Sequence, residues 1–284
     1  MNYVKLNNGI EMPQMGYGVY QVSPQECERC VSDALSVGYR MIDTVHAYDD
    51  ERGVEQAVKE SGIPRSEIWI TSKLWPTEYG EGKTAEAIDK MLKRLGTDYI
   101  DLLYVHQPVG DFVGAWRDME RAVEAGKVRA LGISNFDVND SVFNLILKEA
   151  RIKPAVLQME CHPYAQRLKV REKAKAEGIQ VECWFLLGGA MSQGALLKDP
   201  TIQKIAEAHG KSAAQIILRW HIQEGFSVIP GATNPDYIKE NIQIFDFELT
   251  DEEMQAMRSL NKEQRFFNAS LEQAEQFGRM PMKD

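Results

Sequence analysis

The chain has 284 residues, enough for one large α/β barrel or two smaller domains. Hydrophobic residues make up 44% of it and charged residues 26%, the composition of an ordinary globular protein. A formal net charge of −9 argues against non-specific binding to nucleic acid or to an anionic membrane, because both require a basic surface. It does not exclude a small anionic ligand, since one local pocket can be positive.

The apolar runs and the start of the chain do not indicate a membrane protein. The longest apolar stretch, 184–191, contains two glycines and is much shorter than the roughly 18 residues of a spanning helix. Residues 1–5 show no signal-peptide core. These patterns predict a cytoplasmic protein.

The predicted elements begin with a hairpin over 3–12, in which Asn8-Gly9 favours a type I′ turn. Short apolar strands are then expected near 15–20, 41–45, 68–74, 100–106, 129–134, 155–160, 180–186 and 227–230. Helical patterns lie near 24–37, 51–61, 82–95, 114–125, 138–149, 167–178, 201–224 and 234–242. The last long helix is expected to begin at Thr250, whose capping-box partner is Glu253.

Eight strands that alternate with helices predict an α/β fold, a (β/α)8 TIM barrel with an N-terminal β-hairpin, as one domain over 1–284. An open doubly wound sheet would also alternate. However, Gly16-Tyr17-Gly18 is followed by Val19-Tyr20-Gln21, without the third glycine of a dinucleotide-binding turn. Loops near 109–116 and 188–195 and the tail after 260 are expected to surround the barrel mouth.

Cys27 and Cys30 have the C-x-x-C spacing of a metal or redox pair. They lie inside a predicted helix, and no second pair stands nearby to complete four ligands. We therefore expect packing side chains and predict no metal site.

Functional side chains of such a barrel gather at the C-terminal ends of the strands. The polar residues expected there are Asp43, Tyr48, Lys73, His106, Ser134, Asn135, Gln158 and Glu160. Each taken singly also has a structural explanation, such as an aspartate that caps a turn. Four titratable groups of complementary type on three successive strands are harder to explain as coincidence.

The chemistry of these four groups is coherent. A phenol, with an ordinary pKa of about 10, becomes a usable acid when a nearby ammonium stabilises its phenolate. A carboxylate holds the ammonium charged and in place, and an imidazole can orient a carbonyl oxygen. This set fits protonation of a carbonyl while hydride arrives from a nicotinamide cofactor, because side chains cannot supply hydride. Tyr20, Trp75 and Phe112 are expected to line a dry pocket.

Five ordered motifs resemble those of the aldo-keto reductase family, and the resemblance runs from the hairpin to about Leu260. The motifs are 38–44 with Tyr48 and Glu51, 71–75, 105–108, 132–136 and 158–164. The resemblance implies NAD(P)H-dependent reduction of an aldehyde or ketone. It implies that Tyr48 donates the proton, that Lys73 and Asp43 tune it, and that His106 positions the substrate carbonyl.

The resemblance also implies where the cofactor binds. Ser134, Asn135 and Gln158 would hold the carboxamide of the nicotinamide. Trp184 stands where the family usually has a tyrosine that stacks on the ring, and its indole offers a comparable face. The serine and proline that usually follow are replaced by Phe185 and Leu186.

The adenosine end departs from the family. Members that prefer NADPH have Lys and Arg where this chain has Gly231 and Tyr237, and those cations bind the 2′-phosphate. Glu240 and Asn241, used by the family at the adenine, are retained. The resemblance implies NADP(H) as cofactor, and the two replacements make use of NAD(H) plausible, with Lys239 as an alternative phosphate partner. Further expected cofactor contacts are Leu187, Ala232 and Thr233.

Two other functions remain open at this point. A barrel metallohydrolase would use Asp43, His46, Asp50 and His106 as ligands. A nicotinamide-binding redox sensor would show little turnover. The identity of the small-molecule carbonyl substrate is not readable, and Phe266, Phe267 and Phe277 either cover the pocket or attach the tail to the barrel. A monomer is expected, with neither nucleic acid nor membrane as a partner.

Overall fold

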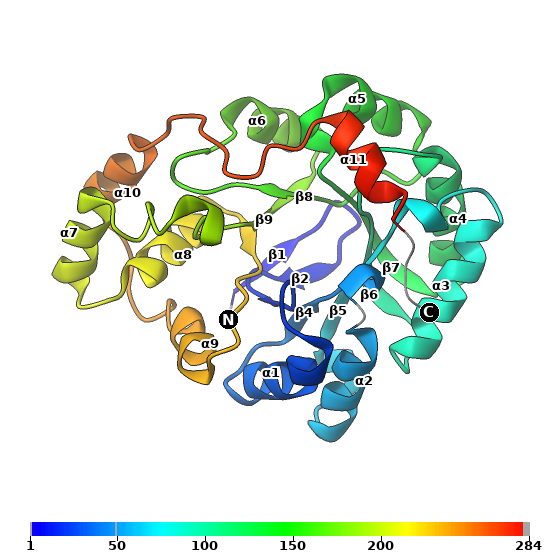
Figure 1. The fold of residues 1–284 in the computed structure, drawn as a ribbon, viewed down its shortest axis with the longest axis horizontal. Helices are drawn as coiled ribbons and strands as arrows, with labels where there is room; N and C mark the ends of the chain where they lie inside the picture. The colour runs from blue at the N-terminus through cyan, green and yellow to red at the C-terminus, as the bar shows by residue number, and fades with distance from the viewer. Residues whose placement is uncertain (1, 49, 281–284) are drawn as a thin grey trace.

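The computed structural model describes residues 2–48 and 50–280, with the backbone alone at Tyr48 (Figure 1). Its centre is one sheet of eight parallel strands in the order β10-β9-β8-β7-β6-β5-β4-β3. The strands are β3 (Tyr17–Gly18), β4 (Met41–Asp43), β5 (Trp69–Leu74), β6 (Ile100–Val105), β7 (Val128–Ser134), β8 (Val156–Glu160), β9 (Gln180–Trp184) and β10 (Ser227–Val228). All eight predicted strands are present.

The two outer strands meet and close the sheet into a barrel. Gly16 N donates to Val228 O at 2.8 Å, and Gly18 N donates to Pro230 O at 3.1 Å. Met15 and Val228 form a parallel bridge at the same seam. The predicted TIM barrel is therefore confirmed.

Helices surround the barrel and cover the outer face of its strands (Figure 1). They are α1 (Pro24–Ser36), α2 (Glu51–Glu60), α3 (Lys83–Arg94), α4 (Phe112–Glu124), α5 (Asp140–Glu149), α6 (Leu168–Ala176), α7 (Pro200–His209), α8 (Ala213–Gln223), α9 (Pro235–Ile242), α10 (Asp251–Arg258) and α11 (Leu271–Gly278). In α3 the buried side chains Thr84, Ala87, Ile88 and Met91 recur at helical spacing, so one face packs on the sheet. Most strand residues are buried because both faces of the strands are covered.

The single helical segment predicted over 201–224 is wrong. Gly210, at φ 60°, ends α7, and Ser212 begins α8 with a capping box to Gln215. A glycine in the left-handed region followed by a new N-cap is a helix break, and both signals are readable in the sequence.

The predicted N-terminal hairpin is present as β1 (Tyr3–Lys5) and β2 (Glu11–Pro13), but its turn type is not the expected one. Of the three described residues at its tip, Asn7, Asn8 and Gly9, only Gly9 has a positive φ, 86°. A type I′ turn needs two such residues, so a three-residue loop connects the strands instead.

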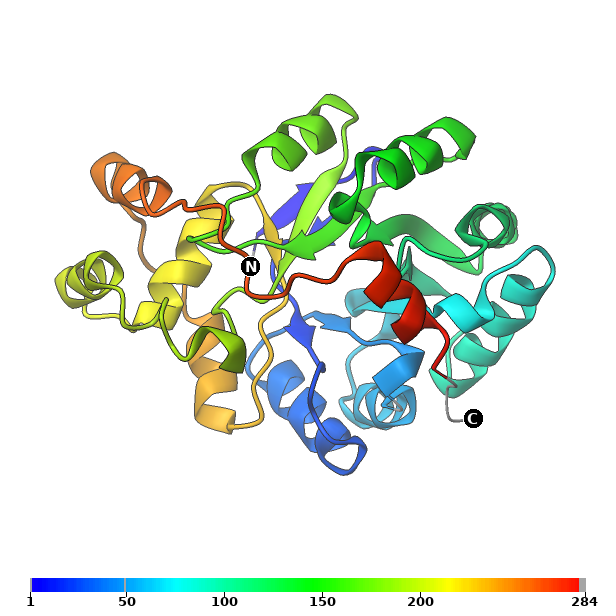
Figure 2. The ribbon, with the colours of Figure 1, turned by 45° about the horizontal axis from the view of Figure 1, so that its top comes forward.

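After α10 the chain crosses the front of the barrel and ends in α11, a helix that the sequence pattern did not predict (Figure 2). Lys262 N and Gln264 N both donate to Tyr164 O at 3.0 Å, which attaches this tail to the segment after β8. The predicted capping box between Thr250 and Glu253 begins α10 as expected. Within the described ranges, no helix is long and apolar enough to cross a membrane.

Candidate active site

Three of the four proposed catalytic residues stand at the C-terminal ends of neighbouring strands. Asp43 ends β4, Lys73 lies near the end of β5, and His106 follows β6. Lys73 Nζ donates to Asp43 Oδ1 at 2.5 Å and to Thr44 O at 3.1 Å. Lys73 and Asp43 are 2% and 4% exposed, so they form a buried ion pair. Burial of either charge alone would cost much free energy, and the attraction between the two charges offsets that cost.

The fourth residue, Tyr48, ends the short helix η1 (His46–Tyr48) that follows β4. Its side chain falls outside the described residues, so the assignment of a proton-donating phenol remains a prediction. The backbone places it five residues beyond Asp43, on the mouth side of the strand.

His106 is buried beside Lys73. Its backbone N donates to Leu74 O at 3.2 Å, and its ring lies edge-on to Trp75 at 5.1 Å between centroids. Burial, and to a lesser degree the charge of Lys73, hold the pKa of His106 well below its ordinary value. The imidazole is therefore neutral at physiological pH and has one N–H to donate to a ligand oxygen.

Ser134, Asn135 and Gln158 form one polar cluster at the ends of β7 and β8. Asn135 Nδ2 donates to His106 O at 3.1 Å and to Ser134 Oγ at 3.2 Å. Asn135 adopts φ 64°, a left-handed conformation that asparagine tolerates better than most residues. Gln158 Nε2 donates to Asp43 Oδ2 at 3.0 Å, so the cluster connects directly to the Lys73–Asp43 pair.

The aromatic residues predicted near the mouth separate into groups. Trp184 contacts Phe185 and Phe267, with ring centroids 5.5 and 5.4 Å away. Tyr20 is 54% exposed, which suits the rim of a pocket. Phe112 is buried and packs edge-on against Phe136 at 5.2 Å, and its place in the pocket wall stays a prediction.

The tail is held at the mouth by Glu160, a buried residue at the end of β8. Glu160 Oε2 accepts from Arg265 Nε at 2.8 Å, and Oε1 accepts from the backbone N of Phe266 and of Phe267 at 2.7 and 3.1 Å. Burial acts to raise the pKa of Glu160, but hydrogen bonds from His162 and Arg265 outweigh it and keep that pKa below its usual value. Phe266 stacks on His162, and Phe267 packs on Trp184. These phenylalanines both attach the tail and bring it to the site.

The segment predicted to bind adenosine follows β10 and enters α9. Gly231, Thr233 and Tyr237 are exposed, and Tyr17 Oη donates to Ala232 O at 2.6 Å. A Cβ on Gly231 would stand 2.6 Å from Gly18 O, so the backbone at this position has no room for a side chain. Arg29 of α1 donates to Thr233 O at 3.0 Å. The predicted adenine contacts lie in α9, where Glu240 accepts from Ser212 Oγ and Asn241 is buried, while Leu187 lies half-buried in the loop after β9.

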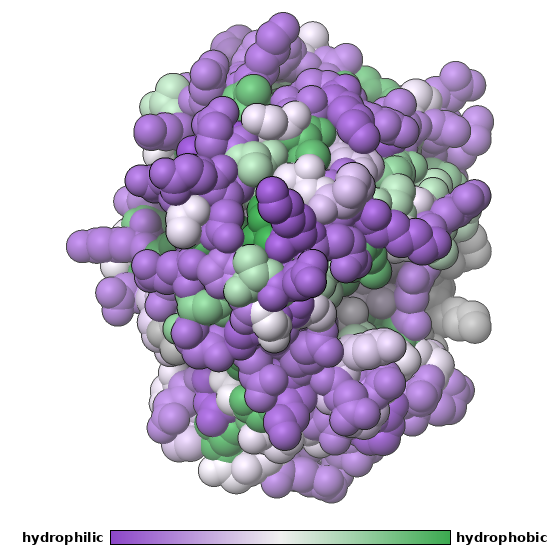
Figure 3. All heavy atoms as spheres, turned by 90° about the vertical axis from the view of Figure 1, so that its left-hand side faces the viewer, coloured by the Kyte–Doolittle hydropathy of each residue, from purple (hydrophilic) through white to green (hydrophobic). Residues whose placement is uncertain are grey.

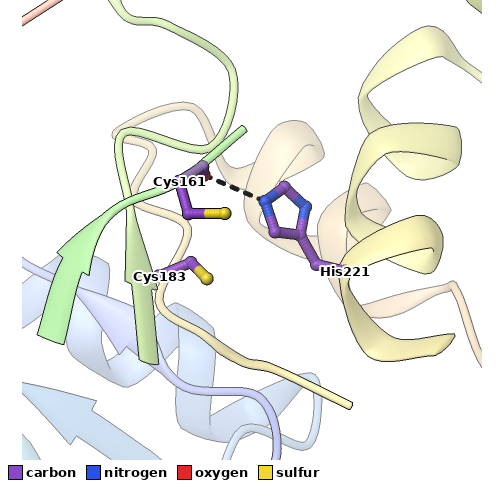
Figure 4. A group of neighbouring side chains, drawn as sticks. All are labelled: Cys161, Cys183 and His221. Carbon is purple, nitrogen blue, oxygen red and sulfur yellow. Dashed lines mark hydrogen bonds between the residues drawn. The ribbon is translucent and has the colours of Figure 1, made fainter. Parts of the chain in front are cut away.

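Metal-ligand atoms gather at one place only within the described residues. Cys161, Cys183 and His221 are buried between the barrel wall and α8, with their ligand atoms within 4.8 Å of one another (Figure 4). His221 Nε2 faces Cys161 O at 3.0 Å and Nδ1 faces Ile217 O at 2.7 Å, so backbone carbonyls occupy both ring nitrogens. Burial also raises the pKa of the Cys183 thiol well above its usual value, which disfavours a thiolate ligand.

The ligand set of the metallohydrolase alternative is not assembled. Asp43 is paired with Lys73, His46 Nδ1 lies 2.8 Å from Glu78 Oε1, and Asp50 accepts from Thr44 Oγ1. These three residues therefore serve separate contacts, and nothing in the described part of the chain supports that alternative.

The sequence reasoning missed two residues that line the barrel interior beneath the site. Tyr104 Oη donates to Glu182 Oε1 at 2.8 Å, and Gln158 Nε2 donates to the same oxygen at 2.7 Å. The signal that reveals them is the period of two along a strand: Tyr104 shares a face with His106, and Glu182 shares one with Trp184.

The residues expected at the nicotinamide end fit a cofactor, and they differ in charge from those expected at its 2′-phosphate end. At the first, Ser134, Asn135 and Gln158 present amide and hydroxyl groups next to a buried cation. At the second, Gly231 and Tyr237 are neutral, and Arg29 is already paired with Glu26 and Asp33 at 3.3 and 2.8 Å. Fold and site together define a barrel oxidoreductase that uses a nicotinamide cofactor without a Rossmann turn.

Comparison with known proteins agrees with this class. Residues 9–262 match the model of the aldo/keto reductase family. The chain is 44% identical over 264 residues to glyoxal reductase of Bacillus subtilis, covering 92% of this chain and 94% of that protein. The solved aldo/keto reductase of Brucella melitensis is 43% identical with a TM-score of 0.86, over 91% of this chain and 99% of that one. A Bombyx mori aldo-keto reductase solved with NADP is 31% identical with a TM-score of 0.86, over 94% of each chain.

The chain belongs to the aldo/keto reductase family. It is an NAD(P)H-dependent oxidoreductase, and its fold matches these relatives over nearly its whole length.

Proposed function

We propose that this protein reduces an aldehyde or ketone to an alcohol, with Tyr48 as the proton donor. The observation that carries the proposal is the buried Lys73–Asp43 pair beside a neutral His106, at the strand ends that precede and follow η1. A fixed ammonium next to a phenol stabilises the phenolate left after proton transfer, and this is the step for which ordinary tyrosine is too weak an acid.

Each residue has one task in this proposal. Asp43 keeps Lys73 charged and oriented through the 2.5 Å contact. Neutral His106 donates a hydrogen bond to the substrate oxygen and aligns it toward the proton donor. Trp75, whose ring packs on His106, and exposed Tyr20 form the walls of the substrate pocket.

Ser134, Asn135 and Gln158 hold the carboxamide of the nicotinamide in this proposal. The bound cofactor supplies the hydride. The amide nitrogen of Gln158 is already committed to Asp43 and Glu182, so its carbonyl oxygen is the end left to face the cofactor. Trp184 offers a face for ring stacking, and Phe267 packs against its edge.

The proposed cofactor selectivity is weak, with NADH used alongside NADPH. Two observations support it. The seam between Gly18 and Gly231 leaves no space for the lysine that NADPH-preferring members carry, and Tyr237 is neutral. Arg29, which donates to Thr233 O at 3.0 Å, and the exposed Lys239 are cations beside this segment. Arg29, however, is shared with Glu26 and Asp33. Two acidic neighbours make Arg29 a poorer partner for a phosphate dianion.

The test is the loss of absorbance at about 340 nm with a panel of aldehydes, ketones and keto sugars and with each cofactor. We expect turnover with both cofactors and no effect of a chelator. Cofactor binding without turnover of any carbonyl would favour the redox-sensor alternative. A dissociation constant for NADPH at least about tenfold lower than for NADH would contradict the proposed selectivity.

A monomer is proposed in addition, working in the cytoplasm on a small-molecule carbonyl. The face formed by α7, α9 and α10 is mainly hydrophilic, with apolar side chains scattered singly rather than joined into a patch (Figure 3). The four cysteines are free and buried, which suits a reducing compartment. Light scattering at micromolar concentration tests the oligomeric state.

A further inference from the structure

Beneath the candidate active site lies Glu182, a fully buried carboxyl group in the middle of β9. Its Oε1 atom accepts hydrogen bonds from Tyr104 Oη at 2.8 Å and from Gln158 Nε2 at 2.7 Å. Its Oε2 atom is buried and has no hydrogen-bond partner in the described part of the chain. One oxygen thus accepts two hydrogen bonds, while the other is buried and accepts none from the described residues.

Glu182 is joined to the proposed proton-donating unit through a single amide group. Gln158 Nε2 donates to Glu182 Oε1 and also to Asp43 Oδ2 at 3.0 Å, and Asp43 in turn holds Lys73. Gln158 and Glu182 are directly opposite in the strand register. Both hydrogens of the amide are therefore consumed by carboxylates, which determines the direction in which the carbonyl of Gln158 points.

We propose that Glu182 is a positioning residue for the reductase site: it fixes Gln158 against Asp43, and the charge of its carboxyl sets how strongly Lys73 supports the proton donor. This inference rests on the proposed reduction with Tyr48 as donor. Glu182 acts through Gln158 and Asp43 and reaches neither substrate nor cofactor.

The environment of Glu182 makes its charge variable near neutral pH. Burial raises the pKa of Glu182 to about 7, the charge of Asp43 acts in the same direction, and the hydrogen bonds from Gln158 and Tyr104 and the charge of Lys73 oppose them. The groups that face it are Asp43 of β4, Lys73 of β5, Tyr104 of β6 and Gln158 of β8. Tyr104 is fixed in turn by Gly132 on the neighbouring strand, where a Cβ would stand 2.3 Å from its ring.

The consequence for the reaction follows from the sum of charges. With Glu182 protonated, Lys73 and Asp43 sum to zero. When Glu182 ionises, the cluster becomes negative and the phenolate of the proton donor is less well stabilised. The turnover of carbonyl reduction should therefore fall as pH rises through the pKa of Glu182.

The first measurement is kcat for reduction of one aldehyde at saturating cofactor. For the wild type we expect at least about a threefold fall between about pH 6 and about pH 8. In Glu182→Gln, which keeps the accepting oxygen and the shape, the fall should shrink to less than about half of that in the wild type, with Asp50 as the remaining titrating group. In Tyr104→Phe the fall should move to higher pH, because the ionised carboxylate loses one donor. A wild-type slope that persists in Glu182→Gln overturns the proposal.

Asp50 is the matched control. Burial raises its pKa to about 7 as well, and it too acts on Lys73. The proposal predicts that Asp50→Asn retains a fall near neutral pH. If Asp50→Asn removes the fall and Glu182→Gln retains it, the titrating group is Asp50 and the proposal is wrong.

A second readout needs no turnover. The ionisation of the Tyr48 phenol is followed by ultraviolet difference absorbance between each protein and its Tyr48→Phe counterpart, without cofactor. We expect the phenol to ionise at lower pH in Glu182→Gln than in the wild type, because the wild type carries the extra negative charge in that range. Equal titration would overturn the proposal. A wild type that reduces no carbonyl would refute the proposed function instead, and this titration would still judge the role of Glu182.

Discussion

Gly18 and Gly231 approach each other so closely that a Cβ added to Gly231 would stand 2.6 Å from the carbonyl oxygen of Gly18. A Cβ on Gly18 would in turn stand 2.8 Å from Ile229 O. Both contacts lie at the seam where β3 meets the end of β10, next to the hydrogen bond from Gly18 N to Pro230 O. Gly231 thus allows the barrel to close at a position that has no room for a side chain.

The closeness of this seam predicts a stability cost at Gly231. Gly231→Ala should lower the free energy of unfolding by about 1–3 kcal/mol, because the added methyl must displace backbone rather than a flexible side chain. Urea denaturation measures the change, and Thr233→Ala, an exposed neighbour on the same segment, is the control. Equal stability of the two variants would show that the contact between Gly18 and Gly231 can accommodate a methyl group.

The preference between NADPH and NADH should change when Tyr237 is replaced. Tyr237→Arg is expected to tighten NADPH binding roughly tenfold and to leave NADH binding unchanged, because a guanidinium pairs with a phosphate that only NADPH carries. Fluorescence titration with both cofactors measures it, and Tyr237→Phe is the neutral control. Equal gains for the two cofactors would place Tyr237 away from the 2′-phosphate.

The tail should loosen when Glu160 loses its charge. Glu160→Gln weakens the contacts to Arg265, Phe266 and Phe267, and charged hydrogen bonds of this kind are each worth about 1.5–3 kcal/mol. Because Phe267 packs on Trp184, we expect KM for the carbonyl to rise severalfold with a smaller change in kcat.

Limited proteolysis of the tail should accelerate in the same variant. Glu272→Gln, an exposed change in α11, controls for charge removal on the tail. Unchanged KM and unchanged proteolysis would mean that the tail is held by packing alone.

The buried side chain of His221 should contribute to the loss of folding stability in acid. Burial lowers its pKa from 6.5 to about 4, against the pull of the carbonyls of Cys161 and Ile217. A lowered histidine pKa gives stability that is complete above 6.5 and is lost as pH falls toward about 4, because only the unfolded chain takes up the proton readily. The loss should approach about 3 kcal/mol. Comparison of wild type and His221→Gln by urea denaturation over that range isolates it, and parallel curves would refute it.

The strand ends were predictable because local patterns specify them. Asp43, Lys73 and His106 each follow or end a short apolar run, and such runs place their last residues at one rim of a parallel barrel. The break between α7 and α8 was also predictable from the sequence, since Gly210 and the capping box of Ser212 with Gln215 are local signals.

Contacts between distant segments were not predictable in the same way. Glu160 binds residues about a hundred positions away, and Gly231 meets Gly18 only after the barrel has closed. The alternation of side chains along β9 places Glu182 on the same face as Trp184. No local sequence pattern shows that Tyr104 and Gln158 both donate hydrogen bonds to it.

We propose that this barrel protonates a carbonyl with the phenol of Tyr48. The most direct measurement compares wild type and Tyr48→Phe for turnover of an accepted aldehyde and for cofactor affinity. We expect turnover to fall by at least about a hundredfold in Tyr48→Phe, while the dissociation constant of the cofactor stays within about twofold. Normal turnover by Tyr48→Phe would contradict it.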